Sequence, residues 1–171
     1  MYYLFTPEWE RSLIARDEAM AHLFAAIRDL RFPGIKTVIW AHNTHIEENA
    51  AATDLGMPTM GTYLADALGD DYITFGLIGW DVHLDWGPRR CGPMPTTDFA
   101  ADAVEVLLHE LGERFLLVDL DFRGSDRPFL EPGREYQLGR IHRMVPGDNF
   151  DGLFFLNHSQ RMKPLGWDPC M

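Results

Sequence analysis

The sequence predicts a single α/β domain over residues 1–171, with a mostly parallel sheet of about four strands and flanking helices. Short runs of β-branched, aromatic and aliphatic residues alternate along the chain with longer segments whose apolar residues recur at helical spacing. Strands that are joined through helices form parallel sheets with right-handed crossovers. A chain of 171 residues, 46% of them hydrophobic, is also long enough to bury one core.

Charge, cysteines and hydropathy narrow the class of protein. The net charge of −11 argues against nucleic acid or an anionic membrane as a partner, because either would need a basic surface. Cys91 and Cys170 have no metal-motif spacing, and we expect two free thiols. No apolar run reaches the length of a membrane span and no signal peptide is evident, so we expect a cytoplasmic protein.

The first predicted element is a long helix that begins at Thr6 and Pro7 and ends at the breakers Phe32-Pro33-Gly34. Its apolar residues recur at steps of three and four with one gap, which falls at Arg16. The apolar positions are Trp9, Leu13, Met20, Leu23, Ile27 and Leu30. A guanidinium on an apolar helix face needs a carboxylate or a path to solvent. Arg16 is therefore either part of a structural ion pair or a residue that reaches the site.

A strand buried on both faces is predicted over residues 37–41, because this run is β-branched and aromatic and follows Pro33-Gly34. Four polar side chains follow it directly: His42, Asn43, His45 and Glu47. In open parallel sheets, ligands bind beyond the carboxyl ends of the strands. This segment is therefore the first candidate for a functional site.

The remaining elements follow from local signals in order. A short helix over 60–68 ends at Gly69, a second buried strand covers 72–78, and Thr96-Thr97 begins a helix that continues to Leu111. Two further strands are predicted over 115–122 and 153–156. Residues 81–95 lack periodicity and form a candidate pocket wall beside Trp80, while 123–147 are expected to be mostly loop.

The two histidines suit acid–base chemistry. Histidine titrates near neutral pH, so one imidazole can take a proton from water while another stabilises an oxyanion. His158, which follows the last predicted strand, is the best third candidate because adjacent strand ends meet at one edge. Two alternatives remain open: the imidazoles only bind backbone groups, or His42, His45 and Glu47 hold a metal ion, although two histidines alone are an incomplete zinc site. We expect no cofactor.

Several ordered motifs resemble the erythromycin esterase family from about residue 15 to 165. They are Arg16-Asp17-Glu18-Ala19-Met20-Ala21, Trp40-Ala41-His42-Asn43-Thr44-His45-Ile46, Met60-Gly61, Gly69-Asp70-Asp71-Tyr72, Phe75-Gly76 and Phe150-Asp151-Gly152-Leu153-Phe154-Phe155. The resemblance implies the C-terminal part of that family's fold. It also implies hydrolysis of an ester, including macrolide lactones, by activated water and without a covalent serine intermediate. No Gly-x-Ser-x-Gly sequence is present, in agreement with that mechanism.

The family's general base is a histidine in a Gly-Glu-x-x-His-Gly motif, which these 171 residues do not contain. By resemblance, His42 and His45 are the catalytic pair, and we assign substrate contacts to Asn43, Glu47, Arg16, Trp80 and His158. Three interpretations stay open: a chain that needs a missing N-terminal half or forms a homodimer, a shortened enzyme with His42 as base, and a binding protein that has lost the chemistry. An exposed sheet edge would favour a partner chain.

Overall fold

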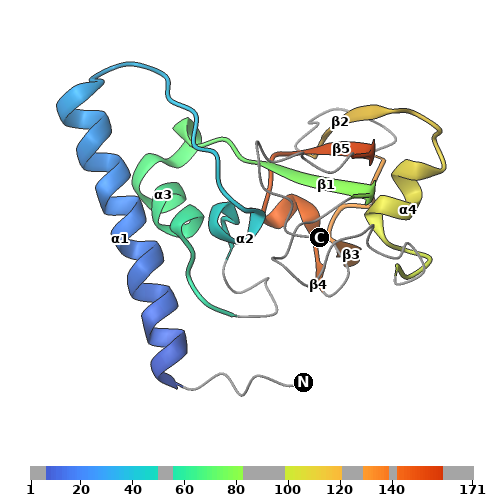
Figure 1. Cartoon of the computed structure of the whole chain (residues 1–171), viewed down its shortest axis with the longest axis horizontal. Coiled ribbons are helices and arrows are strands. Elements are labelled where there is room, and N and C mark those ends of the chain that lie inside the picture. Colours follow the sequence, from blue (N-terminus) through green and yellow to red (C-terminus); the bar gives the residue numbers. More distant parts are fainter. Residues whose placement is uncertain (1–6, 50–55, 83–98, 121–128, 139–141, 160–171) are drawn as a thin grey trace, which may run out of the picture.

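The computed structural model describes residues 7–49, 56–82, 99–120, 129–138 and 142–159. Its helices are α1 (Pro7–Arg31), α2 (Asn43–Ile46), α3 (Met60–Leu68) and α4 (Val104–His109), with short 3-10 turns η2 (Gly69–Asp71) and η4 (Pro146–Asp148). Its strands are β1 (Phe75–Asp81), β2 (Phe115–Asp119), β3 (Tyr136–Leu138), β4 (His142–Met144) and β5 (Gly152–His158). Figure 1 shows α1 and α3 at one end of the molecule, the sheet with α4 at the other, and α2 between them.

The main sheet is mixed, which corrects the prediction of a mostly parallel sheet of about four strands. It has three strands in the order β1-β5-β2, and the central strand β5 is parallel to β1 but antiparallel to β2. The error arose because the segment between β2 and β5 was expected to be loop and crossover. It instead contains the antiparallel pair β3 and β4, whose three-residue strands are too short to show a period of two.

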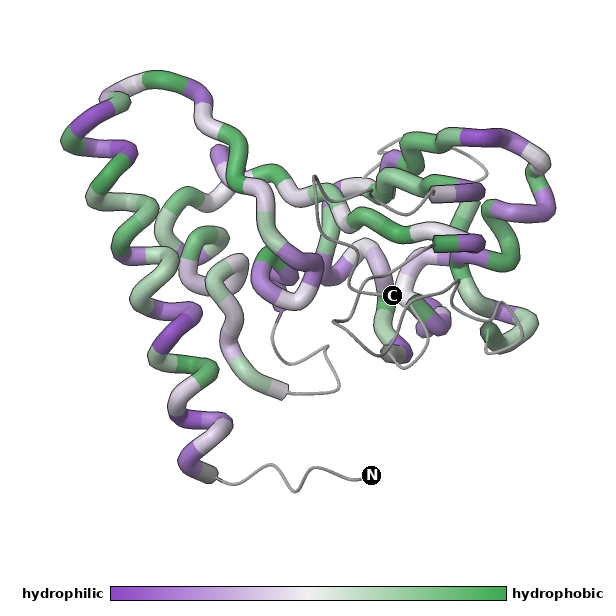
Figure 2. The backbone as a smooth tube through the Cα atoms, viewed as in Figure 1, coloured by the Kyte–Doolittle hydropathy of each residue, from purple (hydrophilic) through white to green (hydrophobic). Residues whose placement is uncertain are grey.

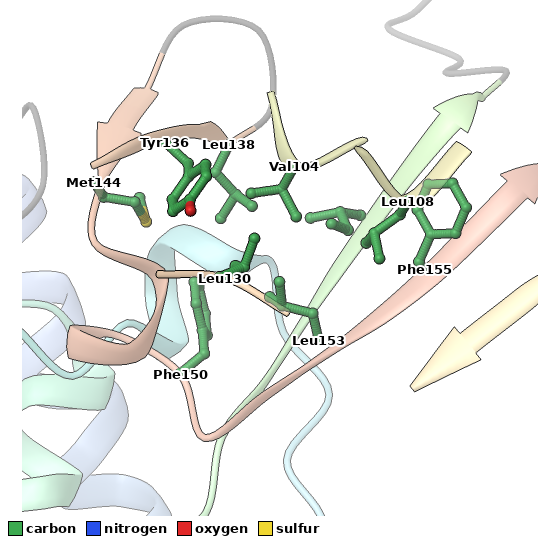
Figure 3. Close-up of a cluster of buried hydrophobic side chains, with 10 residues drawn as sticks. Val104, Leu108, Leu130, Tyr136, Leu138, Met144, Phe150, Leu153 and Phe155 are labelled. Carbon is green, nitrogen blue, oxygen red and sulfur yellow. The ribbon is translucent and has the colours of Figure 1, made fainter. Parts of the chain in front are cut away.

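One face of the sheet carries the larger hydrophobic core. Side chains of β1 and β5 meet α4, β3 and β4 there, and Val104, Leu108, Leu153 and Phe155 are almost completely buried. Figure 3 shows this cluster between the strands and α4. Fully burying such a side chain stabilises the folded state by roughly 1.5–3 kcal/mol, so this face provides most of the packing at the sheet end.

The opposite face of the sheet is apolar, and no described residue covers it. Leu77, Phe154 and Leu117 are register partners across the three strands, so their side chains form one row. Phe75 and Phe115 flank this row, and Phe115 and Leu117 are each 61% exposed. In Figure 2 the strands of this sheet are coloured mostly as hydrophobic residues. A solvated apolar face of this kind marks an interaction surface.

The long first helix is confirmed, although its inward face differs from the prediction. Thr6, the predicted N-cap, lies outside the described residues. The inward positions include Asp17 and Ala21, whereas Leu23 and Leu30 are exposed. Counting only large apolar residues misplaced the stripe, because a small residue and a carboxylate occupy the true inward positions.

Residues 37–41 are extended but belong to no strand of the described structure, so the prediction of a doubly buried strand is wrong. Ile39 and Ala41 pack toward the cluster of α1 and α3. Val38 and Trp40 alternate with them and are 90% and 86% exposed. Alternate side chains therefore point to opposite sides, as in a strand. Burial of the second side would require a neighbouring segment, which the described residues do not supply.

The other boundaries agree to varying degrees. Helix α3 has the predicted bounds, with a capping box between Thr59 and Thr62 and Gly69 at a φ of 54°. Strand β1 begins three residues later than predicted and continues through Gly79, and β5 extends to His158. Helix α4 is shorter than the predicted 97–111. His83, both cysteines and most of segment 81–95 lie outside the described residues.

Candidate active site

The candidate site begins at His42, which caps the short helix α2. Its Nδ1 accepts a hydrogen bond from the backbone N–H of Thr44 at 3.3 Å and lies 3.0 Å from the Thr44 hydroxyl. A backbone N–H only donates, so this Nδ1 carries no proton and the neutral ring has its proton on Nε2. In this tautomer the Nε2–H of His42 is a hydrogen-bond donor.

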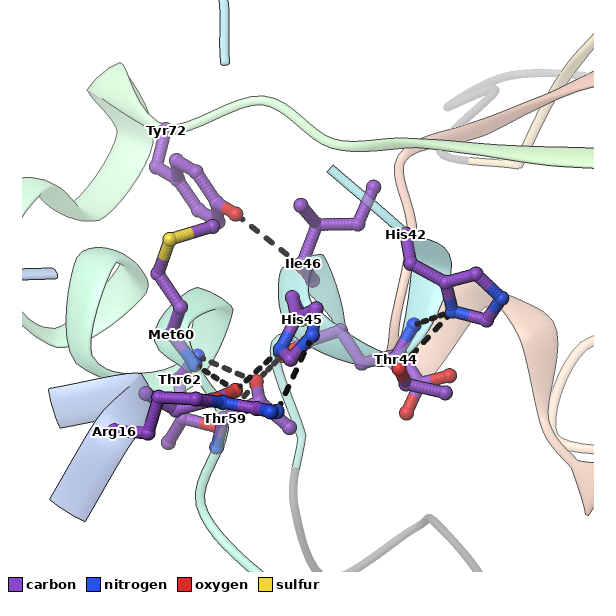
Figure 4. Close-up of polar contacts among 11 residues, drawn as sticks. Arg16, His42, Thr44, His45, Ile46, Thr59, Met60, Thr62 and Tyr72 are labelled. Atoms are coloured by element: carbon purple, nitrogen blue, oxygen red, sulfur yellow. Dashed lines mark hydrogen bonds and ion pairs between the residues drawn. The ribbon is translucent and has the colours of Figure 1, made fainter. Parts of the chain in front are cut away.

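His45 has the opposite tautomer. Its Nδ1 lies 2.8 Å from Oδ2 of Asp17, and its Nε2 lies 3.4 Å from the Arg16 guanidinium. A carboxylate only accepts and a guanidinium only donates, so Nδ1 carries the proton and Nε2 is the acceptor. In Figure 4 the two imidazoles lie on opposite sides of Thr44, with the His45 ring toward Arg16.

Asp17 is the main residue that the sequence analysis missed. It is 5% exposed, and its Oδ2 also accepts the backbone N–H of Met60 at 3.1 Å. The carboxylate therefore connects α1, α2 and the first residue of α3. The sequence carries only part of the signal: the spacing from Leu13 and Ala21 places Asp17 on one face of α1, but its donors are distant along the chain.

Arg16 forms the ion pair that was one of its two predicted roles. Its guanidinium lies 3.4 Å from Oδ1 of Asp17, so the carboxylate partner comes from the same helix. The same group approaches His45, and its side chain is about half exposed. A cation at the solvent side of a histidine can contact an anionic or carbonyl oxygen.

Asn43 and Glu47 hold α2 in position. The Asn43 side chain donates to the carbonyl of Leu77 and accepts the backbone N–H of Leu77, both at 2.9 Å. Glu47 is 5% exposed, and its backbone carbonyl accepts the Thr59 hydroxyl at 2.6 Å. These contacts fix the short helix against β1 on one side and against α3 on the other.

Trp80 and His158 lie on the sheet, apart from the His45 group. Trp80 stacks on His109 at 4.4 Å, on the covered face. His158 Nδ1 lies 3.1 Å from Oδ2 of Asp81, at the end of β1. Asp81 is four residues beyond Leu77, which corresponds to roughly 13 Å along a strand. The structure thus brings together Arg16 and His45, with His42 and Asn43 on the same segment, and separates them from Trp80 and His158.

A second polar cluster lies next to the C-terminal end of α2 and consists of Glu48, Thr74 and Asp151. The Thr74 hydroxyl donates to Glu48 Oε1 at 2.7 Å, and the Thr74 backbone N–H donates to Asp151 Oδ2 at 2.7 Å. Burial raises the pKa of the Glu48 carboxyl, the Thr74 hydrogen bond lowers it, and the charge of Asp151 raises it further. The Tyr72 hydroxyl donates to the Ile46 carbonyl, and burial raises the pKa of Tyr72 above its usual range.

Comparison with known proteins decides the family. Residues 1–159 match the sequence pattern of the erythromycin esterase family. The chain belongs to that family. This confirms the resemblance that the His-Asn-x-His segment and its flanking motifs indicate. Three helical elements of the erythromycin esterase domain thus meet at the Asp17–His45 pair.

Individual relatives give the extent of the match. A Bacillus subtilis (strain 168) protein named "Putative hydrolase YbfO" is 24% identical over 157 residues, which are 86% of this chain and 35% of that protein. A crystal structure of a Bacillus cereus protein matches 90% of this chain and 40% of its own, with 15% identity and a TM-score of 0.69. A succinoglycan biosynthesis protein gives 18% identity, 85% and 38% coverage and the same TM-score.

The structure of a mutant of erythromycin esterase EreC in its open conformation also shares the fold. The TM-score is 0.60 at 15% identity, and the match covers 85% of this chain and 37% of that protein. The chain thus spans about 35–40% of the length of these relatives. At these identities the solved structures establish the fold of this part of an erythromycin esterase domain and nothing finer.

Two other features of the described ranges bear on function. In the described ranges, no three His, Cys, Asp or Glu side chains are placed to hold a metal ion. His42, His45 and Glu47 therefore do not form a three-ligand metal site in this structure. No helix in the described part of the chain is long and apolar enough to cross a membrane.

Proposed function

We propose that this chain provides the histidine-bearing portion of a hydrolase that adds water to a carboxylic ester or a macrolide lactone. The observation that supports the proposal is the hydrogen bond between Asp17 and His45, 2.8 Å long, which leaves the acceptor nitrogen Nε2 at the less buried end of the ring. A histidine oriented by a carboxylate in this way is suited to remove a proton from water. Family membership supports the same class of reaction.

In the proposed reaction, the Arg16 guanidinium turns from His45 Nε2 to the substrate carbonyl. His45 Nε2 then takes a proton from a water molecule while the water oxygen forms a bond to the carbonyl carbon. The carbonyl π electrons move to oxygen, and the resulting oxyanion is stabilised by donors such as the Arg16 guanidinium and the His42 Nε2–H. When the tetrahedral intermediate collapses, the C–O bond to the alcohol breaks. The alkoxide takes the proton from His45, which restores the neutral imidazole.

The other predicted substrate contacts receive different roles in this proposal. Arg16 contacts substrate oxygen, because its guanidinium lies beside His45 Nε2 and is about half exposed. Asn43 acts by holding α2, since its side chain pairs with the backbone of Leu77. Glu47 acts in the same way through its backbone carbonyl, which accepts the Thr59 hydroxyl. Trp80 supports the sheet by stacking on His109, and His158 contacts only a substrate large enough to reach the far end of β1.

We propose further that the active catalyst includes a second portion of polypeptide, which covers the apolar face of the sheet. More than half of each relative lies outside its match to this chain. The row formed by Leu77, Phe154 and Leu117 is an apolar surface at the sheet end whose side chains are 41–61% exposed. Covering it would remove a solvent-exposed apolar patch of the kind that marks protein interfaces. A second copy of the chain is the competing occupant.

The test is mass spectrometry of simple esters and macrolide lactones incubated with the purified 171-residue chain. Gain of one water by a substrate, lost by about 100-fold or more in His45→Ala, would support the role of His45. His22→Ala is the matched control, because His22 is exposed on α1. Turnover by the chain alone would contradict the requirement for a second portion. Equal rates for His45→Ala and His22→Ala would contradict the proposed base.

One observation favours a second function, which is binding without chemistry. The Arg16 guanidinium lies 3.4 Å from His45 Nε2 and donates toward the nitrogen that would have to take a proton from water. A pure binding protein would show a raised unfolding temperature with a macrolide and no product. If the imidazole of His45 only packs against Asp17, His45→Gln would retain that thermal shift.

A further inference from the structure

We propose that Asp17 is a positioning residue that fixes the tautomer of His45, with the proton on Nδ1 and with Nε2 unprotonated. The proposal rests on the proposed function for its catalytic meaning, although the tautomer itself can be measured without any substrate. It adds a second residue of α1, next to Arg16, to the site residues that the sequence predicts.

The two oxygens of Asp17 contact different groups. Oδ2 lies 2.8 Å from His45 Nδ1 and 3.1 Å from the Met60 backbone nitrogen, while Oδ1 lies 3.4 Å from the Arg16 guanidinium. Figure 4 shows these contacts converging between α1, α2 and the start of α3. A buried carboxylate is costly unless donors surround it, and here each oxygen has at least one.

The Met60 contact holds the carboxylate independently of His45. Met60 is the first residue of α3, whose N-terminus carries partial positive charge and unpaired backbone N–H groups. The Thr59 hydroxyl already caps the Thr62 N–H, so Asp17 supplies an acceptor for another first-turn donor. The acceptor that faces His45 is thus fixed by the helix start before any substrate binds.

The arrangement dictates which nitrogen carries the proton. Oδ2 can only accept, so His45 Nδ1 must donate to it. The Arg16 guanidinium near Nε2 can only donate, which disfavours a proton on that nitrogen. If Asp17 were removed, the Nδ1 proton would lose its described acceptor, and the weaker contact of Arg16 with Nε2 would be the remaining described contact that favours this tautomer. The ring would then populate the tautomer with the proton on Nε2, which cannot accept a proton from water.

The experiment is nitrogen NMR of the full chain labelled with 15N-histidine, at a pH where the imidazoles are neutral. The His45 signals are assigned by their loss in His45→Gln. We expect the wild-type ring to carry its proton on Nδ1, and Asp17→Ala to shift the equilibrium toward Nε2–H by at least several-fold. Glu18→Ala, at the exposed neighbouring position, is the matched control and should leave the tautomer unchanged.

Asp17→Asn provides the conservative rescue. The Met60 N–H requires an acceptor at the Oδ2 position, so the amide oxygen should take that place and continue to accept from Nδ1. The variant should therefore fold and keep the wild-type tautomer, even if Asp17→Ala unfolds. A wild-type His45 with its proton on Nε2, or a folded Asp17→Ala with an unchanged tautomer, would overturn the proposal.

The result is separable from the fate of the hydrolase proposal. If the tautomer responds to Asp17→Ala but no ester is hydrolysed, Asp17 still positions the ring and the proposed reaction is rejected. If esters are hydrolysed but the tautomer does not respond, the reaction stands and the role of Asp17 is rejected.

Discussion

Asn43 pairs with both backbone groups of Leu77 on β1. Its side-chain N–H donates to the Leu77 carbonyl and its Oδ1 accepts the Leu77 N–H, each at 2.9 Å. One side chain thereby replaces the contacts that a neighbouring strand would make, and the polarity of the two backbone groups fixes the orientation of the amide. A four-residue helix is not stable by itself, so this pair determines where α2 and its histidines lie relative to the sheet.

Asn43→Ala should lower the free energy of unfolding by about 1–2 kcal/mol, since two hydrogen bonds at roughly 1 kcal/mol each are lost. Asn43→Asp should give no rescue, because one carboxylate oxygen would face the Leu77 carbonyl. Urea unfolding measures both effects. Lys36→Ala, at an exposed position in the same connecting segment, is the control. Equal stability of Asn43→Ala and Lys36→Ala would show that the pair does not hold α2.

Gly61→Ala tests the contact between α2 and α3. A Cβ at this position would meet the backbone carbonyl of Ile46 and would lie 2.5 Å from the Glu47 carbonyl oxygen. Helix propensity alone predicts that alanine stabilises α3 by about 1 kcal/mol. The clash with backbone predicts the opposite sign, a loss of about 1–3 kcal/mol. Thermal or urea unfolding decides between them, and a stabilised Gly61→Ala would mean that α2 can move away from α3.

Local signals were sufficient to predict much of this fold and to single out the candidate site. The bounds of α3 follow from Thr59, Thr62 and Gly69, and α1 ends at the predicted breakers. His42, Asn43 and His45 were found because polar residues follow an apolar run directly. Each of these predictions depends only on residues that are neighbours along the chain.

The errors concern contacts between distant segments. The antiparallel pairing of β2 with β5 depends on a chain reversal through β3 and β4, which three-residue strands do not reveal. Asp17 was missed because an acidic residue on an inward helix face becomes visible only when its donors, His45 and Met60, are known. The solvent exposure of Val38 and Trp40 depends on which neighbour is present, and a single sequence does not contain that information.

The uncovered face of the sheet predicts that solubility can be changed without loss of stability. Leu117→Lys should alter the free energy of unfolding by less than about 1 kcal/mol, because Leu117 is already 61% exposed. It should also reduce self-association, measured by light scattering after size-exclusion chromatography. The control on the opposite face is Leu153→Ala, which should cost about 2–5 kcal/mol because Leu153 is fully buried. A large destabilisation by Leu117→Lys would indicate that this face is packed in solution.

The Glu48–Thr74–Asp151 cluster predicts a pH-dependent stability. Because the pKa of Glu48 is raised above its usual value of 4.5, chiefly by burial, the folded state takes up a proton more readily than the unfolded state. That contribution to stability is complete below the unfolded pKa and is lost as the pH rises through the folded one. At neutral pH the ionised Glu48 therefore destabilises the fold. The effect should stay below about 1 kcal/mol, because partial exposure screens it.

Glu48→Gln should remove this cost while keeping a carbonyl oxygen to accept the Thr74 hydroxyl, which now lies 2.7 Å from Glu48 Oε1. The variant should be more stable than the wild type at pH 7, and the difference should shrink toward zero as the pH falls below 4.5. Urea unfolding at several pH values between 4 and 8, at about 0.1 M salt, measures it. Glu18→Gln, an exposed position on α1, should give a small difference that does not follow this pH profile. A wild type that is more stable than Glu48→Gln at pH 7 would mean that the ionised carboxylate, with its Thr74 hydrogen bond, outweighs burial and the charge of Asp151.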